Sequence, residues 1–189
     1  MEKIKNLLII LLIFPLISLA QKTYVPDDIF ETYLEANGMG DGILLNDSVA
    51  TDSINSVQHI NISGLSISNI IGIEDFINLQ NLACSSNQID SINLTNNTLL
   101  RVLTCHNNNI TELYVSSNLL LEHLDCGSNQ LTTLDVSQNT ALNSLNCHYN
   151  NISTLDLTNL STNIINLNLH TYGNFNLFCI SSSFNTSSC

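Results

Sequence analysis

The residues of this chain that could do chemistry are histidines, cysteines and carboxylates. His106, His123, Asp125 and His148 stand near one another in the middle of the sequence, and imidazole and carboxylate groups are ligands of zinc and copper. No nucleophile–base pair, phosphate-binding loop or pair of catalytic carboxylates stands at a spacing typical of an enzyme. We therefore expect neither enzymatic activity nor a cofactor, and we keep a metal site and a hydrolase as less favoured alternatives.

The six cysteines divide into two sets. Four recur at one fixed position of a repeat: Cys84, Cys105, Cys126 and Cys147. Neighbours in such a column lie ~4.8 Å apart, but their side chains point the same way, whereas a disulfide requires converging Cβ atoms. We expect a column of buried free thiols that act as small hydrophobic residues, with a thiolate metal site as the alternative. The remaining two, Cys179 and Cys189, could form a disulfide near the C-terminus.

A repeat must position these residues. Residues 79–163 hold four consecutive copies of a 21-residue unit, without insertion or deletion. Besides the cysteines, the unit has a leucine column and an asparagine column: Leu82, Leu103, Leu124 and Leu145, and Asn87, Asn108, Asn129 and Asn150. A fixed period of this length with the pattern Leu-x-Cys-x-x-Asn indicates a leucine-rich repeat solenoid. We expect the asparagines to bond backbone groups at tight corners and to have no catalytic role.

Each unit also contains a second strand pattern, such as Leu134-x-Val136-x-x-Asn139. Two strands in one short coil leave no room for a helix on the outer side. We therefore predict a mainly β solenoid of about six coils with two narrow parallel sheets. Its less regular first coil begins near Val57, and residues 70–79 are predicted to form a helical turn.

The segments outside the repeats indicate export and capping. Residues 1–20 have a basic start, an apolar run and small residues before Gln21, as in a signal peptide that is cleaved near Ala20. Residues 21–56 are predicted to form an N-terminal cap, with a helix over 26–36 and then a loop. Gly38, Gly40, Asp41 and Gly42 in that loop lack the carboxylate spacing of a calcium site. The solenoid is predicted over 57–170, and a C-terminal cap or tail over 171–189.

Composition limits the kinds of partner. The chain of 189 residues has a formal net charge of −12, with 44% hydrophobic and 11% charged residues. Such an acidic protein repels phosphate backbones, so we expect no nucleic-acid binding. No stretch after residue 20 has the length of a membrane span. We expect a secreted monomer that is not inserted into a membrane and that resides outside the cell, at its surface or in the periplasm.

The outward residues suggest which side binds a partner. On the cysteine side they change from coil to coil, whereas Thr133-Asp135-Ser137 on the other side recurs as Thr154-Asp156-Thr158. Because a varied surface can encode one partner, the predicted binding residues are on the cysteine side: His106, His123, Asp125, Asn146 and His148, with Tyr149 at the edge. The hydroxyl column of the other side, which includes Thr95 and Ser116, leaves an ice- or mineral-binding surface as a less favoured hypothesis.

The nested 21-residue unit resembles the IRREKO-type leucine-rich repeat of exported bacterial proteins. The start, from Tyr24–Asp28 through Phe30 and Leu34, resembles the segment that often precedes such repeats. Gly72–Phe76 and the following Leu79 resemble an internalin-type first coil. This resemblance implies a surface or secreted protein that binds other macromolecules and has no enzyme activity common to the class. We expect a protein ligand and a role in adhesion, with a glycan as the alternative ligand.

Overall fold

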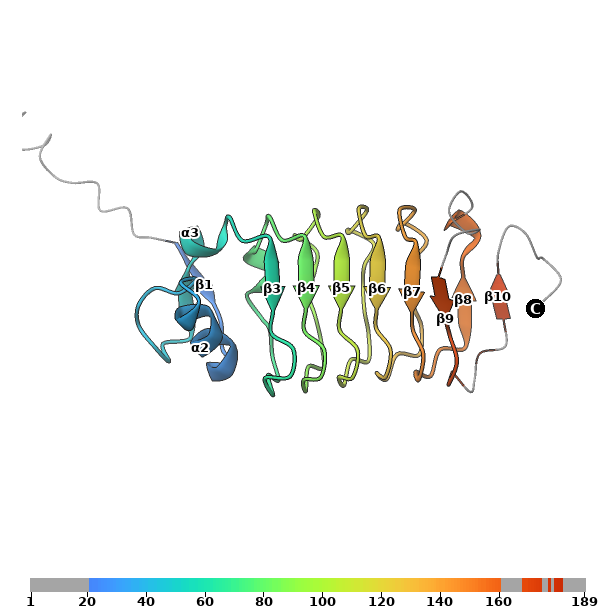
Figure 1. Ribbon diagram of the computed structural model, residues 1–189, viewed down its shortest axis with the longest axis horizontal. Helices are drawn as coiled ribbons and strands as arrows, with labels where there is room; N and C mark the ends of the chain where they lie inside the picture. Colours follow the sequence, from blue (N-terminus) through green and yellow to red (C-terminus); the bar gives the residue numbers. More distant parts are fainter. Residues whose placement is uncertain (1–20, 161–167, 175–176, 178, 182–189) are drawn as a thin grey trace, which may run out of the picture.

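The computed structural model describes residues 21–160, 168–174, 177 and 179–181. The strands lie side by side along the long axis of an extended solenoid, and helix α2 (Asp28–Ala36) lies at its N-terminal end (Figure 1). The predicted signal peptide, the last residues of the fourth unit (161–163) and Cys189 lie outside the described residues. The cleavage near Ala20, the coil count of six and the Cys179–Cys189 disulfide therefore stay predictions.

One six-stranded parallel sheet runs the length of the solenoid in the order β3-β4-β5-β6-β7-β9. Leu82, Leu103, Leu124 and Leu145 are direct partners across β4 to β7, so the constant 21-residue step becomes a constant register. This confirms the predicted leucine-rich repeat solenoid with a parallel sheet. Its strands are β3 (His59–Asn61), β4 (Asn81–Ala83), β5 (Val102–Thr104), β6 (His123–Asp125), β7 (Ser144–Asn146) and β9 (Asn168–His170).

The core is a stack of identical apolar layers behind this sheet. The leucine and cysteine columns are both buried, with exposed fractions of 1% or less from Leu82 to Cys147. The two columns stand two residues apart along the chain, and both point inward because successive strand residues face opposite sides. The residue between them, such as Thr104 or Asp125, therefore points outward.

The second predicted sheet is not continuous, which corrects the expectation of two matching sheets. Within the described residues this side forms one parallel pair, β8 (Thr154–Asp156) with β10 (Cys179–Ser181). Elsewhere on this side the described residues turn without pairing as strands. Asn93 Oδ1 accepts the N–H of Thr95 at 3.2 Å, and Asp135 Oδ1 accepts that of Ser137 at 2.8 Å. The same side-chain bond also stands in the paired strand β8, where Asp156 Oδ1 accepts the N–H of Thr158 at 2.9 Å. Asparagine and aspartate bond their own backbone in this way at turns.

Two asparagine columns fasten successive coils together. Asn129 Nδ2 donates to the carbonyl of Cys126 in its own coil and to that of Cys105 in the preceding coil, while its Oδ1 accepts the N–H of Ile110 at 3.0 Å. Asn174 continues this column beyond the four predicted members. The second column differs, because the Oδ1 atoms of its members are buried without a partner among the described residues: Asn97, Asn118 and Asn139.

The N-terminal segment is more structured than the sequence indicated. Helix α2 begins at Asp28 with Asp27 as its N-cap, so Pro26 precedes the helix and is not its first residue. The predicted loop over 37–56 contains β2 (Ser48–Ala50), which pairs antiparallel with β1 (Lys22–Tyr24), and the short helix α3 (Thr51–Ile54).

The helical turn predicted within 70–79 is a short 3₁₀ helix, η1 (Ile73–Asp75), and a second one, η2 (Thr158–Leu160), follows β8. None of the helices over residues 21–160, or in the described residues beyond, has the length and apolar composition that a membrane-spanning segment requires.

Candidate functional site

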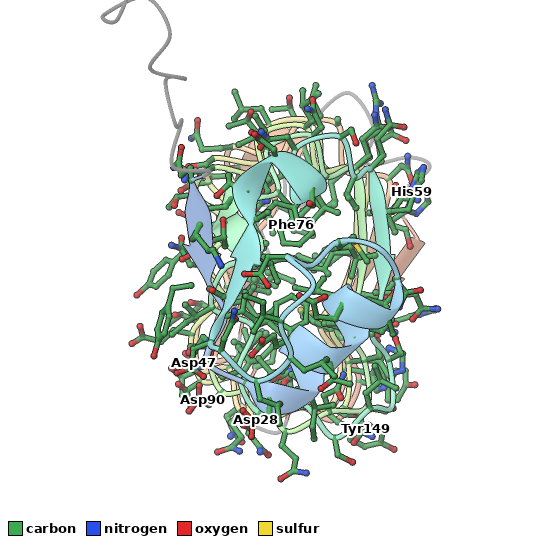
Figure 2. The ribbon with its side chains drawn as sticks, turned by 90° about the vertical axis from the view of Figure 1, so that its left-hand side faces the viewer. Asp28, Asp47, His59, Phe76, Asp90 and Tyr149 are labelled. Atoms are coloured by element: carbon green, nitrogen blue, oxygen red, sulfur yellow. The ribbon has the colours of Figure 1, made fainter. Side chains whose placement is uncertain are left out.

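The outward side of the six-stranded sheet, called the strand face below, carries the histidines of this protein. His59, His123 and His170 are outward residues of β3, β6 and β9, and His106 and His148 directly follow the inward Cys105 and Cys147. Figure 2, which looks along the solenoid, shows His59 on one side and Asp90 on the other. The acidic residues of the second side and the histidines of the strand face are thus separated by the core.

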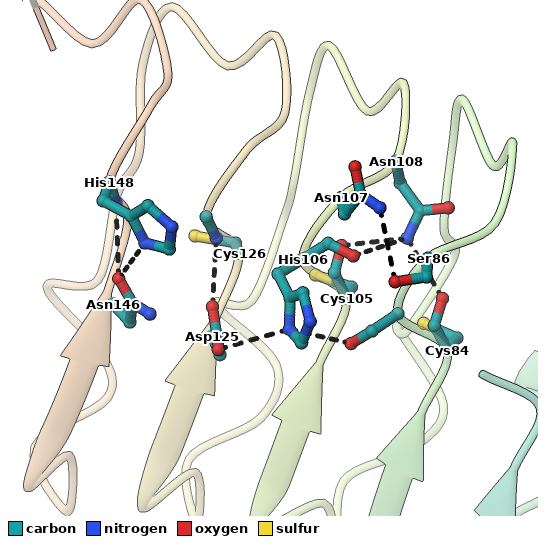
Figure 3. Close-up of polar contacts among 12 residues, drawn as sticks. Cys84, Ser86, Cys105, His106, Asn107, Asn108, Asp125, Cys126, Asn146 and His148 are labelled. Carbon is teal, nitrogen blue, oxygen red and sulfur yellow. Dashed lines mark hydrogen bonds and ion pairs between the residues drawn. The ribbon is translucent and has the colours of Figure 1, made fainter. Parts of the chain in front are cut away.

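His106 and Asp125 meet across the boundary between two coils (Figure 3). His106 Nδ1 lies 3.3 Å from Asp125 Oδ2 and 3.0 Å from the hydroxyl oxygen of Ser85. Serine, histidine and aspartate are the residues of a hydrolytic triad, but a triad needs the serine at one ring nitrogen and the aspartate at the other. Here both partners contact Nδ1, so the arrangement orients the imidazole and does not activate the serine.

A cluster of aromatic rings stands at the β7–β9 end of the strand face. The His148 imidazole stacks on the Tyr172 ring with centroids 4.8 Å apart, and Tyr149 meets Tyr172 edge-on at 5.3 Å. Two glycines make room for the rings, because a side chain at Gly127 would overlap the imidazole of His148, and one at Gly173 would overlap the ring of Tyr149. Tyr149 and Tyr172 are 55% and 58% exposed, so the cluster presents aromatic surface to solvent.

Tyr149 is held in an unfavourable backbone conformation. Its φ is 48°, in the left-handed region, as are those of Ser86, Asn107 and Ser128 at the same position of the preceding coils. Small polar residues tolerate this region better than bulky ones, and the left-handed conformation costs an L-residue roughly 1–2 kcal/mol. A tyrosine at a turn that otherwise takes serine or asparagine therefore points to a role beyond the turn itself.

The structure gathers five of the six predicted binding residues into two groups and leaves His123 outside both. His106 and Asp125 form one pair. In the other group, Asn146 Oδ1 accepts the backbone N–H of His148 and contacts Nδ1 of its ring, and Tyr149 packs against that ring in the aromatic cluster. His123 is exposed at the start of β6, two residues before Asp125 on the same face of the strand. Sequence reasoning missed Tyr172, because it lies beyond the regular units, and Gly127, whose signal was the loss of a side chain in one unit alone.

The structure does not assemble the histidines into a metal site. Within the described part of the chain, the group whose ligand atoms lie close enough to share one ion, within 4.8 Å, is Asp28, Glu31 and Asp47 at the N-terminal end (Figure 2). Glu31 is fully buried, and its two oxygens accept the N–H groups of Asn46 and Asp47 at 2.9 and 3.0 Å. This carboxylate therefore holds the loop against the helix.

The four thiols of the cysteine column are buried and poorly reactive in the folded protein. Cys84, Cys105, Cys126 and Cys147 are free and buried. Burial raises the pKa of the Cys84 thiol to about 12 and that of Cys147 to about 11, and it raises those of the two central thiols well above their usual range. Since the thiolate is the reactive species, these thiols are neither nucleophiles nor ready metal ligands.

Comparison with solved structures places this geometry among known folds. The functional domain of InlJ from Listeria monocytogenes, which includes a cysteine ladder, superposes with a TM-score of 0.68 at 28% sequence identity. The match covers 88% of this chain and 39% of that one. The chain has an internalin-like leucine-rich repeat fold.

A second structure, an internalin (InlF) from Listeria monocytogenes, shows the same fold with a TM-score of 0.61 at 24% identity, covering 84% of this chain and 44% of that one. The chain thus spans less than half the length of both structures. No protein-family model and no curated protein sequence matches it.

Proposed function

We propose that this protein is an exported, non-enzymatic binding module whose strand face recognises another protein at or outside the cell surface. The internalin-like fold supports a protein-interaction role. The contact surface comprises His106, His123, Asp125, Asn146, His148 and Tyr149, together with Tyr172. The single observation that carries the proposal is Tyr149, because a bulky ring is kept exposed at a left-handed turn.

The aromatic cluster of the strand face provides anchors that are already in place before a partner binds. Binding energy concentrates in a few central residues, among which tyrosine is enriched. Tyr149, Tyr172 and His148 already contact one another in the free protein, so their side chains lose less conformational entropy on binding than free rotamers would. The His106–Asp125 pair adds polar groups of defined direction in the two preceding coils.

The finer assignments follow from the same reasoning. Residues 1–20 act as a signal peptide, and residues 21–56 cap the first of about six coils. Asp27 supports the cap role, since its Oδ1 accepts the N–H groups of Ile29 and Phe30 in α2 while its Oδ2 accepts those of Ser68 and Asn69 in the first coil. We propose a monomer without a cofactor, and the cysteine ladder of InlJ supports a structural role for the cysteine column here.

A glycan is the second candidate ligand, and the aromatic cluster is what favours it. Exposed tyrosine rings beside an asparagine amide offer an apolar face for a sugar ring and polar groups for its hydroxyls. Parallel protein and glycan arrays probed with the full chain distinguish the two classes. A hit on the glycan array alone would overturn the protein-ligand proposal.

The test of the strand face uses substitutions on both sides of the solenoid. Once the arrays supply a ligand, His123→Ala with Asp125→Ala should weaken binding at least tenfold, ~1.4 kcal/mol. Tyr149→Asn, which installs a residue suited to the left-handed turn, should also weaken binding while leaving the free energy of unfolding within about 1 kcal/mol. The matched control on the opposite side, Asp135→Ala with Asp156→Ala, should change affinity little. The reverse result would show that the other side binds.

A further inference from the structure

A hollow of about 200 Å³ lies on the side of the solenoid opposite the strand face, near its N-terminal end. It is lined by Ile70, Ile71 and Glu74, the last of which belongs to η1, and by residues of the segments 91–93 and 112–114 in the next two coils. Pockets for small molecules typically measure ~300–1,000 Å³. The hollow therefore has the size for one long side chain and is too small for a whole drug-sized ligand.

The walls of the hollow are apolar. Ile70 and Ile92 are 1% and 7% exposed and line its base, and Ile71 and the ring of Tyr114 stand beside it at 45% and 68% exposure. These last two are among the large apolar side chains that the fold leaves in solvent. An occupant that covers them removes apolar surface from water, which favours binding.

The rim of the hollow is negatively charged. Glu112 accepts a hydrogen bond from the hydroxyl of Tyr114 at 2.8 Å, and Glu74 accepts the N–H of Gly72 at 2.9 Å. The two basic residues in the described part of the chain pair elsewhere, Lys22 with Asp41 and Arg101 with Glu122. Neither rim carboxylate therefore has a cationic partner among the described residues.

The residues that make the hollow break the repeat. At the positions of Glu112 and Tyr114 the next two units carry threonine and aspartate, as Thr133 with Asp135 and as Thr154 with Asp156. The outward residues of this side therefore repeat over those two units but not over the whole solenoid. By the reasoning that singled out the strand face, a departure of this kind marks a surface with a use of its own.

We propose that this hollow is a second contact site that receives an arginine side chain of a partner protein. The methylene stem of the arginine packs between Ile71 and the Tyr114 ring. The guanidinium stacks on that ring and reaches the carboxylates of Glu74 and Glu112, an arrangement that suits the planar, always charged group better than the ammonium of lysine. The site lies across the core from the strand face and does not depend on it.

The test uses the full chain with labelled isoleucine methyl groups and N-acetyl-arginine methylamide as the probe. NMR titration should move the Ile71 and Ile92 resonances with a Kd on the order of 1–10 mM. The citrulline analogue, which has the same shape and no charge, should bind much more weakly. Glu112→Gln and Tyr114→Ala should each weaken arginine binding about two- to fivefold. Asp135→Asn removes one charge from the same side outside the hollow and should have no effect.

Three results would overturn the proposal. The first is the absence of shifts at Ile71 and Ile92. The second is an equal response to citrulline or to N-acetyl-lysine methylamide. The third is an equal loss with Asp135→Asn, which would indicate general attraction to an acidic protein. Because the strand-face substitutions lie across the core, failure of this site and failure of the proposed function give separate readouts.

Discussion

Replacing one asparagine from each corner column by alanine should have very different consequences for stability. Asn129 and Asn118 are both buried, at 8% and 0% exposure. The amide of Asn129 donates to three backbone carbonyls of its own and the preceding coil, and that of Asn118 donates to two carbonyls of the preceding coil. They differ in their oxygens, because Asn129 Oδ1 accepts the N–H of Ile110, whereas Asn118 Oδ1 has no partner among the described residues. The two substitutions therefore compare the contribution to stability of a hydrogen-bonded buried amide oxygen with that of one that has no partner.

The magnitudes follow from what each substitution leaves behind. In Asn129→Ala the carbonyls of Cys105 and Cys126 keep the amides of Asn108 and Asn150 as donors, and that of Gly127 keeps a backbone donor. The N–H of Ile110 is orphaned, however, which alone costs ~1–3 kcal/mol. With the lost bonds the total is about 2–5 kcal/mol. In Asn118→Ala the carbonyls keep backbone donors, and the orphaned oxygen disappears. The two contributions nearly cancel, so the expected cost is about 0–1 kcal/mol.

Urea unfolding followed by circular dichroism measures the difference. Asn129→Ala should lower the midpoint by about 1 M relative to Asn118→Ala if the slope is near 2 kcal/mol/M. The slope must stay unchanged for the comparison to hold, since solenoids can lose cooperativity. Equal costs for the two variants would refute the reasoning, because they would mean that the amide oxygens of the Asn118 column have partners after all.

The remaining predictions concern the cysteine column, the cap and the N-terminus. Cys105→Ser should destabilise the fold by ~1–3 kcal/mol, because it buries a hydroxyl without a partner, and the native thiols should react with a thiol reagent only after unfolding, as mass spectrometry of labelled protein would show. Asp27→Ala should cost about 2–4 kcal/mol in thermal or urea unfolding, since it removes the N-cap and the bonds to Ser68. Burial raises the pKa of Asp27, but its hydrogen bonds with Phe30, Ser68 and Asn69 lower it more, so the pKa lies below its usual range. This stabilisation is therefore complete above the unfolded pKa and is lost as the pH falls through the folded one, and a flat acid profile would contradict the assignment. Intact mass of the exported protein should begin at or within a few residues of Gln21, and a product that retains Met1 would rule out cleavage.

The parallel sheet and its register could be predicted from the sequence because the relevant information is local and periodic. Leu82 and Leu103 stand one unit apart, so counting residues suffices to pair them. The second side carries a similar Leu-x-Leu pattern, but among the described residues β8 and β10 are the strands that pair there. The side-chain bonds of Asn93 and Asp135 do not account for this, because Asp156 makes the same bond within the paired strand β8. The Leu-x-Leu pattern alone therefore does not distinguish a segment that pairs from one that does not.

Contacts between distant segments were not predictable in this way. Strand β1 pairs with β2 across the whole of α2, and Glu31 looks like an ordinary solvent-facing helix residue although it is fully buried. On the strand face, the proximity of His106 and Asp125 follows from the register. Tyr172 lies beside His148 because β9 pairs in register with β7, but the step from Leu145 to Leu169 is 24 residues, longer than the regular 21, so counting by units does not find it. Glu112 and Tyr114 were visible as departures from the unit, but their hollow also needs Ile71 from outside the regular coils.

The corner asparagines have a consequence for how such a chain can evolve. Each one bonds its own coil and the coil before it through the same atoms, as Asn108, Asn129 and Asn150 do, so every junction between units is chemically alike. A whole unit can therefore be duplicated or lost by recombination while the fold stays intact. The pair of His106 and Asp125 spans one such junction, and a unit inserted there would separate them. Recombination between units would thus exchange ligand specificity and conserve the scaffold.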